Sequence, residues 1–181
     1  MADVARIHVG KLEAARRQFS SAISLQFSNG DPIAVHTLVG ASSIIISDLV
    51  EAKCPERSWD RFAQDANDLS PEEYFRIMRL AQNFLKHAKN DPGATLDYDP
   101  ADSDSLGFWI TLNLGELGCQ LTAQESVFQL WYLACYSPVL DEPTAPHQSA
   151  IGLFGDLRNV SRDERIRVGA AVMAKETTND A

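Results

Sequence analysis

One short stretch of this chain concentrates cationic, amide and imidazole side chains that can act on an anionic group. Arg76, Arg79, Asn83 and Lys86 are spaced by three, four and three residues, so a helix would align them in one polar stripe with His87 at its border. Guanidinium, ammonium and amide groups donate hydrogen bonds to phosphates and carboxylates. Neighbouring cations disfavour imidazolium, which would leave His87 neutral and available as a general base. The stripe is a candidate anion site; the alternative is a solvated helix face on which His87 interacts only with the helix dipole.

A second histidine, His36, follows Asp31, the expected N-cap of an apolar helix, by five positions. One interpretation is a half-buried imidazole that bonds a backbone carbonyl or a neighbouring helix. The other is that His36 joins His87 in one cleft, as a ligand or a base. Both remain open at this level, because two histidines on different helices meet only through the tertiary fold.

Four aspartates, Asp97, Asp99, Asp102 and Asp104, lie close together after this stretch. A calcium loop of the EF-hand type needs glycine at its sixth position and glutamate at its twelfth. Loops that start at Asp97 or Asp99 have neither residue at those positions. We therefore expect a solvated acidic loop whose aspartates cap a helix and partly neutralise the cationic stripe. We expect no metal and no cofactor.

The rest of the chain shows helical periodicity, which must position these residues. Asn29-Gly30 marks a helix end and Asp31-Pro32 a helix start. No segment alternates with a period of two between turn residues, so the sequence predicts an all-α protein. We expect a single helical bundle of five to seven helices with an N-terminal antiparallel helical hairpin. The expected helices cover residues 4–28, 32–54, 57–67, 70–90, 103–115, 122–134 and 161–172.

The composition indicates a single domain over residues 1–175, followed by a disordered tail at 176–181. The chain has 181 residues and a net charge of -9, which disfavours broad attraction to nucleic acid or anionic membranes. Its three cysteines form no CxxC pair, and no uninterrupted apolar run reaches the ~18 residues typical of a membrane span. We therefore expect a soluble cytoplasmic protein. The number of apolar helices also predicts a possible homodimer.

Part of the chain resembles a known group of proteins. Residues 83–88, Asn-Phe-Leu-Lys-His-Ala, followed by Asp91-Pro92, are similar to a motif of an uncharacterised bacterial all-helical family, as are residues 11–17 and 31–38. This resemblance covers residues 10–100 and implies no established activity. More remotely, an Arg and a His on one late helix resemble the HEPN superfamily of RNases and RNA-binding or scaffolding domains.

The HEPN resemblance implies particular roles for two residues. In HEPN nucleases, four to six residues separate the Arg from the His, whereas seven separate Arg79 from His87 here. The resemblance would make His87 the base and Arg79 the group that stabilises the phosphate. Because the spacing departs from the nuclease pattern, it favours a non-catalytic relative.

Three functional hypotheses follow. The first is a binding or regulatory module whose stripe (Arg76, Arg79, Asn83, Lys86, His87), with His36 as a further candidate, recognises an anionic group on RNA, a nucleotide or a partner protein. The second is a metal-independent RNase of the HEPN type, with His87 and Arg79 as its catalytic residues. The third is a purely structural or interaction protein that has no ligand site.

Overall fold

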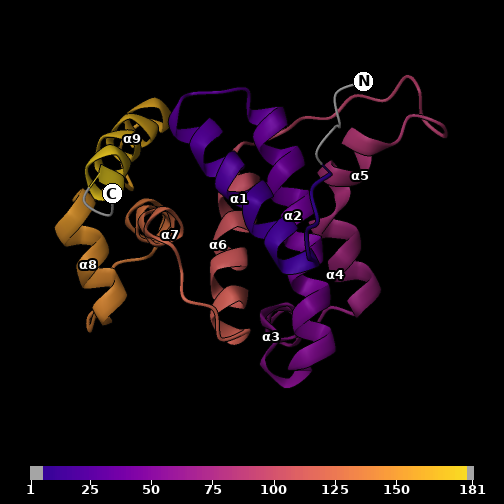
Figure 1. Ribbon diagram of the computed structural model, residues 1–181, viewed down its shortest axis with the longest axis horizontal. Helices are drawn as coiled ribbons and strands as arrows, with labels where there is room; N and C mark the ends of the chain where they lie inside the picture. The colour runs from indigo at the N-terminus through magenta and orange to yellow at the C-terminus, as the bar shows by residue number, and fades with distance from the viewer. Residues whose placement is uncertain (1–5, 179–181) are drawn as a thin grey trace.

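The computed structural model describes residues 6–178, and within this range the chain is all-α (Figure 1). This confirms the predicted fold class, but the described residues form nine α-helices and one 3₁₀ helix where five to seven helices were expected. One predicted helix is divided in two, and another helix forms in the proline-rich segment expected to be a loop. The helices are α1 (Lys11–Phe27), α2 (Pro32–Lys53), η1 (Pro55–Arg57), α3 (Trp59–Ala66), α4 (Pro71–Met78), α5 (Leu80–Lys86), α6 (Ala101–Glu116), α7 (Ala123–Tyr136), α8 (Ala145–Phe154) and α9 (Arg162–Thr178).

The two ends of the chain differ from the prediction. Helix α1 begins at Lys11, after an extended Gly10, and not near residue 4. Helix α9 continues to Thr178, so the first part of the expected disordered tail is helical. Residues 4–5 of the first expected helix and residues 179–181 of the expected tail lie outside the described residues.

The connection between α1 and α2 follows the local signals in the sequence. Asn29 adopts a positive φ of 57°, and the Asp31 side chain accepts hydrogen bonds from the backbone N–H groups of Ile33 and Ala34. Helices α1 and α2 lie side by side (Figure 1), and the buried Ser42 hydroxyl donates to a backbone carbonyl of α1 at 2.9 Å. The small residues of α2 thus allow close approach.

Helix α2 is long and apolar enough, by length and composition alone, to cross a membrane. In the fold it packs between α1 and α6, and its buried residues include Val39, Ile46 and Val50. A buried core helix of a globular domain meets the same criteria, so its apolarity is accounted for by its central position.

The helices form two groups that share one hydrophobic core. Helices α1, α2 and α6 pack together with α3–α5 at one end, and α7 packs against α8 and α9 at the other (Figure 1). Phe19 of α1 meets Phe128 of α7 edge-on, and Trp131 of α7 is fully buried. The indole N–H of Trp131 donates to the Arg165 carbonyl at 2.8 Å, which ties α7 to α9.

The segment expected to be one helix over 70–90 bends at Arg79 and ends at Lys86. Arg79 (φ -103°, ψ 7°) separates α4 from α5, and His87 is extended. The two halves dock on different neighbours: the Tyr74 hydroxyl of α4 bonds Asp60 of α3 at 2.8 Å, whereas Gln82 of α5 lies against α2. A bend between these two contacts allows both to form.

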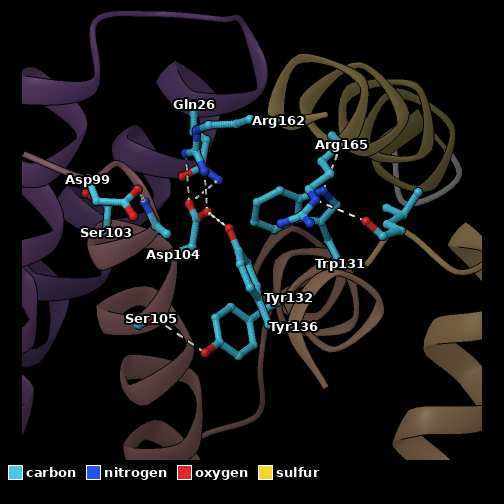
Figure 2. A network of polar contacts seen from close by, with 12 residues as sticks. Gln26, Asp99, Ser103, Asp104, Ser105, Trp131, Tyr132, Tyr136, Arg162 and Arg165 are labelled. Atoms are coloured by element: carbon cyan, nitrogen blue, oxygen red, sulfur yellow. Dashed lines mark hydrogen bonds and ion pairs between the residues drawn. The ribbon is translucent and has the colours of Figure 1, made fainter. Parts of the chain in front are cut away.

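A buried carboxylate joins the two groups of helices (Figure 2). Asp104 of α6 is fully buried and accepts hydrogen bonds from Gln26 of α1 (3.0 Å), Tyr136 of α7 (2.6 Å) and Arg162 of α9 (2.5 and 3.1 Å). Charge-assisted hydrogen bonds are the strongest in proteins, and a two-pronged Arg–carboxylate pair also fixes orientation. Asp104 thereby sets the position of the first turn of α6.

We expect Asp104→Ala to lower the free energy of unfolding by about 3 kcal/mol, because it leaves one partly buried cation and two polar groups without their acceptor. Urea unfolding followed by circular dichroism measures the change. Asp102→Ala is the matched control: it removes an exposed carboxylate from the same helical turn and should cost about 1 kcal/mol or less. Equal losses in the two variants would contradict the role given to Asp104.

Candidate functional site

The predicted stripe becomes the outer face of two short helices. Arg76, Asn83, Lys86 and His87 are exposed, and Arg79 is half-buried. The Arg79 guanidinium lies over the Phe75 ring, 4.4 Å from its centroid, in a cation–π contact. His87 is the first residue after α5, and its backbone N–H donates to the Asn83 carbonyl at 3.1 Å. The structure thus keeps these residues on one segment but places them on both sides of a bend.

The cations of this face lack intramolecular acceptors. From Arg16 to Arg167, both included, every arginine except Arg76 and Arg79 interacts with a carboxylate or a backbone carbonyl. Within the described part of the chain, Arg76, Arg79 and Lys86 make no hydrogen bond or ion pair through their side chains. We call Arg76, Arg79, Lys86 and the adjoining Asn83 and His87 the α4–α5 face.

One carboxylate does lie within electrostatic reach of this face. Hydrogen bonds from Ser70 lower the pKa of Glu73, and the charge of Arg76 adds a smaller effect in the same direction. Glu73 is already engaged in the capping box that begins α4. The hydrogen bonds of Glu73 thus go to Ser70 at the start of α4, and within the described residues none of them goes to the cations of the α4–α5 face.

His36 lies elsewhere, in the interior. Its side chain is 1% exposed, and its Nδ1 is 3.1 Å from the Ser103 hydroxyl and 3.3 Å from the Tyr98 hydroxyl. The two hydroxyls are themselves 2.5 Å apart, and the Tyr98 ring meets the imidazole edge-on. The structure therefore brings His36 together with Tyr98 and Ser103, whereas His87 is exposed beyond the end of α5.

The environment of His36 makes it a neutral imidazole with one unused nitrogen. Burial lowers its pKa. Its Nε2 is buried and has no hydrogen-bond partner among the described residues. An unpaired buried polar atom costs about 1–3 kcal/mol of stability, so groups of this kind are rare in native structures and call for an explanation.

A cavity of about 280 Å³ adjoins His36, which we call the His36 pocket. It lies between α2, the inner side of α4–α5, the segment before α6, and the first turns of α6. The same two short helices that carry the α4–α5 face on the outside therefore form a wall of this pocket. The lining residues are His36, Ile77, Met78, Leu80, Ala81, Leu96, Asp97, Tyr98, Asp102, Ser105 and Leu106.

The four aspartates of the acidic segment have separate surroundings. Asp99 accepts a hydrogen bond from the backbone N–H of Ala101, the first residue of α6, at 2.9 Å, although the N-cap of α6 is Pro100, and Asp104 is the buried carboxylate described above. Asp97 and Asp102 are exposed and line the His36 pocket. Among the described residues, no ion pair joins these aspartates to the α4–α5 face, and no group of three or more His, Cys, Asp or Glu side chains is arranged to hold a metal ion.

Tyr98 and Ser103 were not identified from the sequence as partners of His36. Tyr98 lies among the aspartates, and Ser103 lies at the start of the helix expected over residues 103–115. Their proximity to His36 depends on how α6 packs on α2, across sequence separations of more than 60 residues. No local spacing carries that information.

Comparison with known proteins gives no indication of the function of this chain. No family model, curated protein or solved structure matches this chain.

We expect His36 to make stability depend on pH. Because burial lowers its pKa in the folded state, the unfolded chain binds the His36 proton first as the pH falls below the ordinary value of 6.5. The stability that neutral His36 contributes is present above about pH 6.5 and is lost as the pH falls through the window below it.

Urea unfolding of the wild type and of His36→Gln, at about pH 7.5 and about pH 5.5, should show that the free energy of unfolding declines more steeply in the wild type. The excess should be at most about 1.4 kcal/mol per pH unit. Parallel declines would show that His36 is not the titrating group.

Proposed function

We propose that this protein is a binding module that recognises a phosphate-rich polyanion, such as single-stranded RNA, through the α4–α5 face. The observation that carries this proposal is that Arg76, Arg79 and Lys86 make no hydrogen bond or ion pair through their side chains with the described residues, whereas the other arginines from Arg16 to Arg167 are engaged. Lys and Arg side chains that contact phosphates release condensed counterions, and this supplies most of the affinity of sequence-independent binding.

The length of the face favours a polyanion over an isolated phosphate. Arg76 lies on α4 and Lys86 is the last residue of α5, beyond the bend at Arg79, and α5 alone is about 10 Å long. One phosphate group cannot contact side chains distributed over such a distance, whereas a nucleic acid backbone presents repeated charges along it. The net charge of -9 opposes the approach of any polyanion, so binding must be local and sensitive to salt.

The unpaired cysteines support a cytoplasmic location for this activity. Cys54 and Cys119 are half-buried, Cys135 is buried, and all three are free thiols. Free cysteines are usual in reducing compartments. The homodimer expected from the sequence remains a prediction.

Binding to a fluorescently labelled single-stranded RNA, measured by anisotropy over a range of salt concentrations, tests the proposal. We expect the double variant Arg76→Ala/Lys86→Ala to bind more weakly. The plot of log K against log salt concentration should become shallower by about 1.4, which is 0.7 for each lost phosphate contact.

The matched control is Lys53→Ala/Lys175→Ala, which removes the same charge from exposed positions outside the α4–α5 face. It should retain the wild-type salt dependence. If the two double variants show the same affinity and salt dependence, or if the wild type binds no RNA, the α4–α5 face is only a solvated surface. That outcome agrees with the third hypothesis, a structural or interaction protein that has no ligand site.

The alternative of a metal-independent RNase depends on Arg79 and His87, which lie at opposite ends of α5. Eight positions along a helix correspond to about 12 Å, too far for both groups to act on one phosphate without rearrangement. We therefore expect equal, background-level cleavage of the same RNA by the wild type and by His87→Ala. Cleavage that His87→Ala abolishes would establish the enzyme instead.

A further inference from the structure

We propose that the His36 pocket is a binding site for a small amphipathic molecule that carries an ammonium group. The carboxylates of Asp97 and Asp102 would hold the ammonium group, and the apolar part of the ligand would pack on the inner side of α4–α5. This site is separate from the α4–α5 face, which lies on the outside of the same helices, and it selects the opposite charge.

The charges of the lining residues determine the class of ligand. Two carboxylates and no arginine or lysine line the pocket, and the imidazole in its wall is kept neutral by burial. An anion would therefore meet like charges, whereas an ammonium group would meet opposite charges at short range in a partly desolvated place.

Two titratable groups at the pocket have pKa values raised by burial and, to a smaller extent, by nearby negative charge. Burial and the nearby charge of Asp99 raise the pKa of Asp102. Burial also raises the pKa of Tyr98; the charges of Asp102 and Asp104 add to this effect, whereas the Ser103 hydrogen bond and the charge of Arg162 oppose it. A cation bound beside Asp102 would relieve this repulsion.

The size and walls of the pocket determine the rest of the ligand. Small-molecule sites usually enclose ~300–1,000 Å³, so a cavity of about 280 Å³ admits a small molecule only. Its apolar lining includes Ile77 and Leu80, which are 53% and 56% exposed although they are large and apolar. A ligand that covers these side chains removes apolar surface from water.

His36 supplies an independent sign that the site is incomplete without a ligand. It is 99% buried, forms part of the pocket wall, and has a ring nitrogen without a hydrogen-bond partner. If Nδ1–H donates to Ser103, Nε2 is the ring nitrogen that remains as an acceptor without a partner among the described residues.

The test uses 2-phenylethylamine as the probe, with 2-phenylethanol as its uncharged counterpart and 3-phenylpropionate as its anionic one. Titration of the full chain followed by ¹H–¹⁵N NMR should show saturable shifts around His36, Tyr98 and Leu80 for the amine. Binding should be at least about fivefold weaker for the alcohol and absent for the carboxylate. No saturable binding of the amine, or equal binding of the amine and the alcohol, would overturn the proposal.

Two pairs of variants locate the site. Asp102→Asn should weaken binding of the amine about fivefold or more, whereas Asp99→Asn, which removes a neighbouring charge outside the pocket lining, should have a smaller effect. Leu80→Lys should abolish binding by placing a cation at the pocket, whereas Val139→Lys adds the same charge at a remote exposed position and should leave binding intact. Unchanged affinity in both Asp102→Asn and Leu80→Lys would overturn the proposal.

Arg76→Ala/Lys86→Ala should bind the amine normally, so the RNA proposal and the amine proposal can fail independently.

Discussion

The carboxylate of Asp104 is the interaction on which the arrangement of the molecule most depends. Its two oxygens accept hydrogen bonds from three helices other than its own, and none of its surface is exposed to water. A buried carboxylate is tolerated only with such a complete set of donors. The donors come from α1, α7 and α9, so the carboxylate requires these helices to meet at the N-terminal end of α6.

The position that Asp104 gives to α6 also affects the His36 pocket, because the residues next to Asp104 in the same turn face other helices. Within one turn of α6, Asp104 points toward α7 and α9 (Figure 2), Ser103 contacts His36 of α2, and Asp102 and Ser105 line the pocket. Successive positions on a helix differ by about 100° in direction, so one turn can reach several partners. The structural centre and the candidate ligand site are therefore two sides of the same helical turn.

Much of the fold could be predicted from local signals, because each of them is satisfied within a few residues. The Ser70–Glu73 and Thr122–Glu125 capping boxes both form, and Asp31 caps α2 as expected. The bend at Arg79 could not be predicted in this way, since it reflects the docking of Tyr74 on α3 and of Gln82 on α2. Periodicity describes an isolated helix, whereas the bend results from tertiary contacts on its two halves.

The candidate site shows the same division between local and tertiary information. The exposed cations of the α4–α5 face could be identified because their type and spacing are properties of one segment. The surroundings of His36 could not, because Tyr98 and Ser103 reach it only after α6 has packed on α2. His36 and His87 differ in burial, since His36 lies in the interior and His87 is exposed. The spacing of residues along the sequence does not reveal this difference.

The unpaired buried polar atoms are distributed unevenly between the two groups of helices. Within the described residues these atoms belong to Gln18, His36, Trp59 and Gln82, which come from α1, α2, α3 and α5; none comes from α6–α9. On the side of α7–α9, the buried polar groups of Trp131 and Tyr136 are satisfied by α9 and α6. A polar group without a partner is destabilising in the isolated chain, and it is retained at little net cost where a bound molecule supplies the partner. The buried polar groups of Trp131 and Tyr136 on the α7–α9 side are thus satisfied within the chain, whereas the four unpaired atoms belong to the group of helices that holds the His36 pocket and the α4–α5 face.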